Sequence, residues 1–213
     1  MLYNIIKELF SLAHPSGFSE SEIAEVKRMY GKIPYALECY YRELGRENEV
    51  NHTQNNLVVP WKRWQKNETH LIIYTENQWF CCWGISLNDL AADNPPVYVS
   101  YDEKTWELES NSVSDFLIAM AHLHAGFVLP FTNKEIYGIS EKEAAIIRAH
   151  FAKKCEPTMQ WLDGGIEFYG NHACDSIVMM RRNAGDYDLS YASGNKTYFK
   201  EMDKILSTLG EAY

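Results

Sequence analysis

Two short apolar runs in the first half of the chain predict a β-hairpin. Residues 71–74 and 79–85 are rich in β-branched and aromatic side chains, and the polar residues Glu76, Asn77 and Gln78 separate them. The second run is apolar at almost every position, so both of its faces need cover from other parts of the chain. We therefore expect this hairpin to form the buried centre of the fold.

Helical periodicity flanks the hairpin on both sides. Ser19 with Glu22, and Ser140 with Glu143, have the spacing of a capping box, which predicts that a helix begins at each pair. The predicted helices are residues 2–10, 19–30, 34–44, 112–127, 140–154 and 195–209, with a single turn at 86–92.

Short strands separated by turns fill much of the remaining chain. The predicted strands outside the hairpin are residues 57–59, 97–101, 159–162, 166–169, 176–180 and 189–191. Residues 105–108 are predicted to be another strand or an arm against residues 97–101, and residues 46–56 are predicted to be loop. Short connections favour antiparallel pairing. The predicted fold class is α+β, with a central, mostly antiparallel sheet flanked by N-terminal and C-terminal helices. We expect one domain, residues 1–213, in which residues 1–129 form the core and residues 130–213 extend its sheet or form a small subdomain.

The composition is typical of a globular protein outside the membrane. The 213 residues are 46% hydrophobic, which is enough for a well-filled core. No apolar run reaches the ~18 residues of a membrane-spanning helix, and the N-terminal segment lacks the features of a signal peptide. The five cysteines have no CxxC spacing, which favours reduced thiols over a disulfide framework. These features predict a cytoplasmic protein.

Charge is unevenly distributed along the sequence. The formal net charge is -9, and between residues 67 and 133 Lys104 is the only basic residue, against nine acidic ones. Such a field repels nucleic acid and membrane phosphates and attracts basic proteins. The alternative is an ordinary solvated surface whose acids pair with lysines from other segments. The acids that we expect to contact a partner are Glu76, Asp89, Asp93, Asp102, Glu103, Glu107 and Glu109.

A series of short motifs runs through the same region. Its defining residues are Pro34, Leu37, Tyr41, Gly45, Asn77, Trp83, Gly84, Pro96 and Trp106, followed by a helix start at residues 114–117. In this order and spacing, roughly residues 20–127 resemble the SUKH superfamily, which includes fungal cell-wall regulators and many bacterial toxin-immunity proteins. Isoleucine stands at residue 33, where the family usually has leucine. The resemblance implies a SUKH-like fold and no catalytic residue, because the family is not known for one.

Sequence signatures of common enzyme classes are absent. The chain has no Walker-type phosphate loop, dinucleotide fingerprint, HExxH helix or GxSxG elbow. Cys81 or Cys82 with a distant histidine is the remaining candidate for a nucleophile, although an apolar, acid-rich setting opposes a reactive thiolate. His122 and His124 are two residues apart and diverge on a helix, so no metal site is predicted.

Two smaller features have both a functional and a structural interpretation. Trp61 and Trp64, with three basic neighbours, form a patch that suits a stacked nucleotide, but packing at a sheet edge explains it better. The turn at Glu76 and Asn77 is either presented to a ligand or, as we favour, simply uses side chains that bond nearby backbone.

Together these features predict a non-enzymatic protein-binding module without a cofactor or metal. The leading hypothesis is an immunity protein that binds and neutralises a cognate, basic bacterial toxin such as a nuclease. A regulatory adaptor of the cell-wall-regulator type is the second hypothesis, and a cysteine-dependent hydrolase is the third. Neither nucleic acid nor a membrane is an expected partner.

Overall fold

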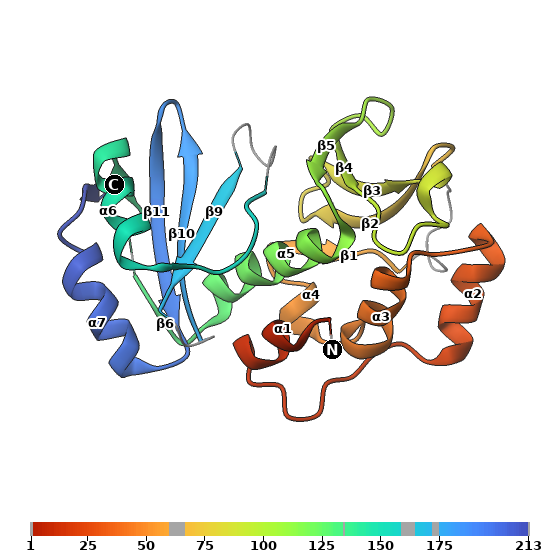
Figure 1. The fold of residues 1–213 in the computed structure, drawn as a ribbon, viewed down its shortest axis with the longest axis horizontal. Coiled ribbons are helices and arrows are strands. Elements are labelled where there is room, and N and C mark those ends of the chain that lie inside the picture. Colours follow the sequence, from red (N-terminus) through yellow and green to blue (C-terminus); the bar gives the residue numbers. More distant parts are fainter. Residues whose placement is uncertain (1, 60–66, 134, 159–164, 172–174, 213) are drawn as a thin grey trace. The chain divides into compact units, whose positions relative to one another are not determined.

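The computed structural model describes residues 2–59, 67–133, 135–158, 165–171 and 175–212 (Figure 1). These residues form helices and two antiparallel sheets, which confirms the predicted α+β class. The chain divides into two compact units: Met1–Tyr3 with Ala13–Leu117, and Asn4–Leu12 with Ile118–Tyr213. We refer to them as unit 1 and unit 2. The proposed single domain with an extension after residue 129 stays a prediction.

Unit 1 contains a sheet with the strand order β1-β2-β3-β4-β5, in which each strand is antiparallel to its neighbours. The strands are β1 (Asn55–Leu57), β2 (His70–Glu76), β3 (Cys82–Ser86), β4 (Val97–Ser100) and β5 (Glu107–Ser110), with the 3-10 turn η2 (Leu87–Asp89) after β3. The helices are α2 (Glu20–Tyr30), α3 (Tyr35–Leu44) and α4 (Asn48–Asn51), and α5 (Val113–Val128) begins in this unit. The predicted hairpin thus supplies β2 and the central strand, β3.

Local chemistry explains where the first helices of unit 1 begin and end. The Glu22 carboxylate accepts a hydrogen bond from the Ser19 backbone N–H at 2.9 Å, and the Ser19 hydroxyl accepts one from the Glu22 N–H, so the predicted capping box is present. Gly31 ends α2 with a φ of 81°, a conformation that glycine adopts without strain. These signals act over a few residues and are therefore readable from sequence.

The core of unit 1 is built on aromatic side chains of the sheet and helices. Trp83 is fully buried, and its ring centroid lies 6.0 Å from that of Phe116 of α5. The Phe116 ring also meets the ring of Tyr74 of β2 edge-on, with centroids 5.8 Å apart. The buried Asn51 of α4 accepts hydrogen bonds from the hydroxyls of Tyr40 at 2.7 Å and Tyr74 at 3.0 Å. A polar cluster thus joins α3, α4 and β2 inside the core of unit 1.

The hairpin turn is longer than predicted. β2 ends at Glu76 and β3 begins at Cys82, and the side chains of Trp79 and Phe80 are 74% and 62% exposed. The expectation that the run is buried from residue 79 is therefore wrong for its first two residues, whereas residues 81–85 are buried. The reason is that hydrogen bonds to Glu76 close the turn before either aromatic residue enters the ladder.

Other boundaries differ by a few residues. The predicted loop at residues 46–56 contains α4 and the start of β1, and the strand predicted at 105–108 is found two residues later as β5. The helix predicted to reach residue 154 ends at His150. The strand predicted at residues 159–162 and the patch around Trp61 and Trp64 lie outside the described residues.

Unit 2 contains a second sheet with the strand order β12-β7-β11-β10-β9-β8, and β6 pairs with β11. Its strands are β6 (Phe131–Thr132), β7 (Tyr137–Ile139), β8 (Ala152–Lys153), β9 (Ile166–Gly170), β10 (Ser176–Asn183), β11 (Asp186–Ser193) and β12 (Glu211–Ala212). Its helices are α1 (Asn4–Leu9), the remainder of α5, α6 (Glu141–His150) and α7 (Lys196–Leu206). The β10–β11 hairpin forms the middle of this sheet.

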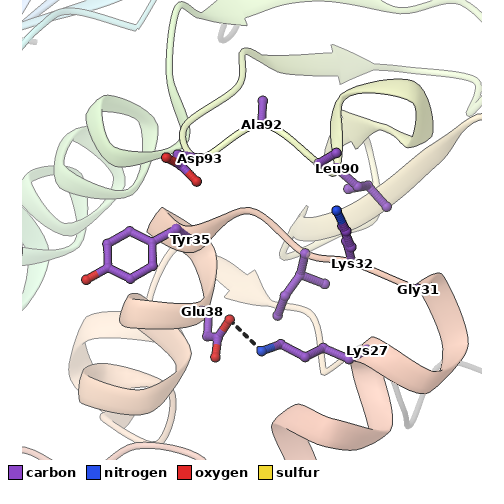
Figure 2. A pocket seen from close by; sticks show the side chains of 10 residues that line it. Lys27, Gly31, Lys32, Tyr35, Glu38, Leu90, Ala92 and Asp93 are labelled. Atoms are coloured by element: carbon purple, nitrogen blue, oxygen red, sulfur yellow. Dashed lines mark ion pairs between the residues drawn. The ribbon is translucent and has the colours of Figure 1, made fainter.

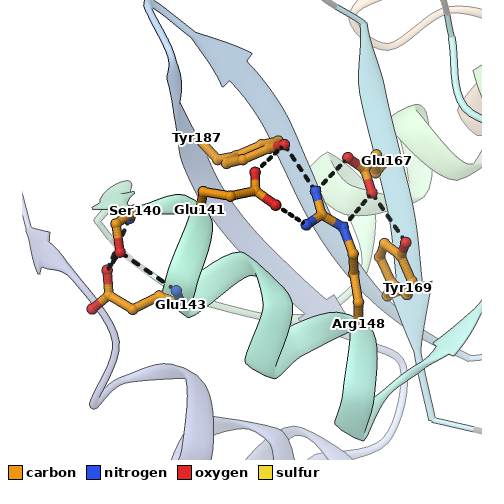
Figure 3. A network of polar contacts seen from close by, with 7 residues as sticks. All are labelled: Ser140, Glu141, Glu143, Arg148, Glu167, Tyr169 and Tyr187. Atoms are coloured by element: carbon orange, nitrogen blue, oxygen red, sulfur yellow. Dashed lines mark hydrogen bonds and ion pairs between the residues drawn. The ribbon is translucent and has the colours of Figure 1, made fainter.

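A network of polar contacts fixes α6 to the sheet of unit 2 (Figure 3). The Arg148 guanidinium donates to Glu167 at 2.8 Å, to Glu141 at 2.6 Å and to the Tyr187 hydroxyl at 2.8 Å. Tyr187 in turn donates to Glu141 at 2.8 Å. Hydrogen bonds from Tyr187 and Arg148 lower the pKa of Glu141, and those from Arg148 lower that of Glu167, so both carboxylates stay ionised. The contacts of this network join α6 to β9 and β11, so we interpret it as structural.

Candidate partner-binding surface

The β2–β3 turn presents two aromatic side chains on a tightly bonded backbone. The Glu76 carboxylate, on a residue only 8% exposed, accepts hydrogen bonds from the backbone N–H groups of Gln78 at 2.6 Å and Phe80 at 3.3 Å. The Trp79 N–H donates to the Glu76 carbonyl at 3.0 Å. The aromatic side chains of residues 79 and 80 therefore project from a turn whose shape is set by a buried acid.

The β4–β5 loop, residues 101–106, is held by an aspartate. The Asp102 carboxylate accepts the backbone N–H groups of Lys104 at 2.8 Å and Thr105 at 2.7 Å. Hydrogen bonds from the Thr105 and Lys104 backbone lower the pKa of Asp102 to about 2. Its oxygens are thus engaged in shaping the loop, although the residue still carries its negative charge.

A stacked pair anchors the end of this loop. The Trp106 ring lies flat on His70 of β2, with centroids 3.8 Å apart and an interplanar angle of 17°. A Cβ atom at Gly84 would lie 3.2 Å from the Trp106 ring and 3.1 Å from the His70 Cβ, so glycine at this position gives the stack room. Burial lowers the pKa of His70, which keeps its ring neutral in this apolar contact.

A ring contact joins the two connections. Phe80 meets Tyr101 edge-on with centroids 5.6 Å apart, and Tyr101 is itself 43% exposed. Glu103 is exposed on the same loop as Tyr101, and Glu107 and Leu108 are exposed on the edge strand β5 that follows this loop. We call this set the loop-tip surface, and it comprises Trp79, Phe80, Tyr101, Glu103, Glu107 and Leu108.

The acids predicted to contact a partner do not gather in one place. Asp93, Asp102, Glu103 and Glu107 are exposed, whereas Asp89 is half-buried. Asp89 and Asp93 lie on the connection from β3 to β4, and in an antiparallel sheet this connection is at the opposite end from the β2–β3 turn.

Two of the predicted contacts need correction. Glu76 is 8% exposed and Glu109 is 1% exposed, so neither carboxylate faces outward. Glu76 supports the turn, as described above. Glu109 falls at the bulge of β5, where Ser110 pairs with Val97 and Leu108 with Tyr98. The sequence did not show that these two carboxylates would be buried, because glutamate residues in strands are usually exposed.

Asp93 lines a shallow pocket at that opposite end of the sheet (Figure 2). The pocket has a volume of about 270 Å³ and lies between the α2–α3 connection and residues 90–93. Its Lys27 pairs with Glu38 at 2.7 Å. Burial favours the neutral form of Glu38, but hydrogen bonds from Lys27 and Arg42 outweigh it and lower the pKa of this carboxyl. With Lys32 and Asp93 added, positive and negative charges balance, so the pocket has no preference for a basic or an acidic ligand.

Most of the motif residues on which the family resemblance rests are buried or shape the backbone. Leu37 and Tyr41 are fully buried, as is Trp83, and Pro34 is the N-cap of α3. A Cβ atom at Gly45 would lie 2.6 Å from the Phe18 ring, so only glycine fits there. Asn77 is exposed in the hairpin turn, and Pro96 is half-buried at the entry to β4. Apart from Asn77, these residues lie within the scaffold, and the other exposed side chains of the turns come from positions outside the motif.

The candidate nucleophile has an unsuitable environment. Cys81 is 4% exposed, and burial, followed by the influence of Cys82 and Glu76, raises the pKa of its thiol to about 12. Such a thiol stays protonated at neutral pH. His122 and His124 are both buried in α5, and burial lowers the pKa of His122 to about 4. Among the described residues, no group of three or more potential metal ligands is present.

Comparison with protein-family models, with curated proteins and with solved structures gives no match for this chain. Within the described part of the chain, none of the helices combines the length and apolar character needed to cross a bilayer.

Proposed function

We propose that the chain is a non-enzymatic protein-binding module that neutralises a basic protein in the manner of a toxin-immunity protein, with the loop-tip surface as its contact. The observation that carries this proposal is the exposure of Trp79, Phe80 and Tyr101 on two adjoining turns. Large aromatic side chains are costly to leave in water and are the residues that dominate protein interfaces. Their exposure at one place favours a partner that covers them.

Charge specifies the kind of partner. Glu103 is exposed in the β4–β5 loop that carries Tyr101, and Glu107 is exposed at the start of β5. Between residues 67 and 133, Lys104 is the only lysine or arginine in the sequence. An acidic rim around an aromatic centre attracts a basic protein, steers its approach and loses this advantage as salt screens the field. If the partner is a basic nuclease, the acids would occupy subsites that substrate phosphates otherwise fill.

The toxin-immunity role rests on the motif order from Pro34 to Trp106, and a cytoplasmic location rests on the five cysteines without CxxC spacing. The raised pKa of the Cys81 thiol supports a binding function over cysteine-dependent hydrolysis. A regulatory adaptor would bind a basic partner without abolishing a toxic activity, so the two roles are separated by whether binding restores growth of cells that produce the partner.

The test is association with the basic proteins encoded beside this gene, measured by stopped flow at several salt concentrations. The double variant Glu103→Lys/Glu107→Lys should bind at least ~10-fold more slowly at low salt and show a flatter salt dependence. The matched control is Asp186→Lys/Glu201→Lys, which makes the same change in net charge at exposed positions of unit 2. Equal effects of the two pairs, or no binding of any basic protein, would contradict the proposal.

A further inference from the structure

Trp79 has a backbone conformation that its side chain disfavours. Its φ angle is 63°, in the left-handed region that glycine, asparagine and aspartate adopt far more readily than a bulky residue. At residue 79 the protein therefore has a tryptophan in a backbone conformation that would be less strained for glycine. Strain of this kind persists where surrounding contacts impose it, and it is frequent at binding sites.

The contacts that impose this conformation come from Glu76. Its carboxylate binds the N–H groups on either side of residue 79, those of Gln78 and Phe80, and its carbonyl accepts the N–H of Trp79 itself. None of these bonds involves the indole ring. The turn would close in the same way around glycine, so the tryptophan side chain is not needed to hold the turn.

The indole ring of Trp79 is also mostly exposed and contributes little buried surface to the fold. At 74% exposure, Trp79 has the largest exposed fraction of the large hydrophobic residues that the structure describes as exposed. The neighbouring ring of Phe80, by contrast, contacts Tyr101. A strained and exposed tryptophan costs folding free energy, and its indole gives little in return within the described part of unit 1.

Its surroundings indicate what the indole face would bind. The same surface carries the exposed carboxylates of Glu103 and Glu107, so a cation would be attracted to it. Tryptophan is the best aromatic partner for a cation, and arginine is the cation found most often in such pairs. A guanidinium can lie flat on the ring while its N–H groups reach a carboxylate.

We propose that Trp79 is the preformed anchor of the loop-tip surface and that its indole face receives an arginine side chain of the basic partner protein. This inference rests on the proposed function and names the chemistry that the partner must present. The closed turn fixes the backbone of Trp79, and with it the direction in which the side chain leaves the chain, so less backbone freedom is lost on association.

The first experiment uses defined peptides and needs no natural partner. The peptide acetyl-Gly-Arg-Gly-Arg-Gly-amide is titrated into ¹⁵N-labelled protein, and the indole N–H signals are followed by NMR. Trp79 is assigned by the signal that disappears in Trp79→Phe. We expect the Trp79 signal to shift with saturation, and the neutral citrulline peptide to leave it in place. An unmoved Trp79 signal, or equal shifts with the citrulline or lysine peptide, would overturn the arginine assignment.

The second experiment measures affinity for the basic protein partner. Trp79→Ala should weaken binding ~30-fold or more, and Phe127→Ala, at an exposed aromatic position of unit 2, should leave it unchanged. Trp79→Gly should bind as weakly as Trp79→Ala but have a higher Tm, because glycine accepts the positive φ. Binding by the wild type that Trp79→Ala does not weaken would overturn the anchor while leaving the proposed function intact. Failure of every basic protein to bind would instead contradict the proposed function. The peptide titration would then still show whether the Trp79 indole binds arginine.

Discussion

The buried carboxylate of Glu76 accepts a hydrogen bond from the backbone N–H of Phe80, four residues further along the chain, at 3.3 Å. With its second bond, to Gln78, it shapes the turn that exposes Trp79. Because the Glu76 side chain is buried and does not reach the exposed surface, its substitution should change stability directly and partner binding only by altering the turn.

Glu76→Ala should lower the free energy of unfolding by about 2 kcal/mol, because two backbone N–H groups of the turn lose the carboxylate oxygen that accepts them. Both N–H groups donate to the same oxygen of Glu76, Oε2, so the amide oxygen of Glu76→Gln can accept both bonds and the loss should be clearly smaller than for Glu76→Ala. Urea unfolding followed by circular dichroism measures both values. A Glu76→Ala protein as stable as the wild type would show that the turn closes without these bonds.

The polar cluster in the core of unit 1 gives a second prediction. Asn51→Ala removes the acceptor shared by the Tyr40 and Tyr74 hydroxyls, and it removes the donor to the Leu44 carbonyl at 2.6 Å. We expect a loss of about 2–4 kcal/mol in the free energy of unfolding, from buried polar groups left without these bonds and from lost packing. Tyr74→Phe should cost less in the Asn51→Ala background than in the wild type, and additive costs in this double-mutant cycle would contradict the coupling.

Stability should rise with pH between about 4 and 6.5 because of His122. Burial lowers the pKa of this imidazole from 6.5 to about 4, while the Nδ1–H donates to the Ile118 carbonyl at 2.8 Å. Within this window the unfolded chain binds a proton that the folded chain does not, so acidification favours unfolding. The contribution is on the order of 3 kcal/mol, fully present above pH 6.5 and lost as the pH falls towards 4.

The check for this prediction is the free energy of unfolding of the protein at several pH values. His122→Leu should flatten the rise, leaving the smaller part that His70 contributes through its own lowered pKa. Substitution of the exposed His150 by Gln serves as the control and should leave the slope unchanged. An unaltered slope in His122→Leu would assign the pH dependence to other groups.

A glycine of the family-like motif gives a fourth prediction. In Gly45→Ala the new Cβ atom would lie 2.6 Å from both the Phe18 ring and the Tyr41 carbonyl oxygen, so the chain must shift. We expect a loss of about 1–3 kcal/mol in the free energy of unfolding, as for other overpacked positions. Partner affinity, measured well below the unfolding transition, should be unchanged. A large loss of affinity in a stable Gly45→Ala protein would place α3 in the interface.

Local signals made much of the fold predictable. The capping boxes at Ser19 and Ser140 are confirmed because each depends on side chains three residues apart. The central position of residues 82–85 followed from an apolar run that required cover on both faces.

The exposure of Trp79 was not predictable in the same way. Its residue type indicates burial, and only the reach of the Glu76 carboxylate to Gln78 and Phe80 decides that the turn includes it. The burial of Glu109 likewise depends on a bulge in the pairing with β4, which no residue type signals. A polar Glu-Asn-Gln segment followed at once by aromatic residues was the available hint, because a turn of that composition can extend into the apolar run.

The most direct test of partner binding by the loop-tip surface is hydrogen–deuterium exchange of this protein alone and in complex with a basic protein encoded beside its gene. Slower exchange confined to residues 77–80 and 101–108 is the expected result. Slower exchange in unit 2 or along α2 and α3, with those two segments unchanged, would contradict it.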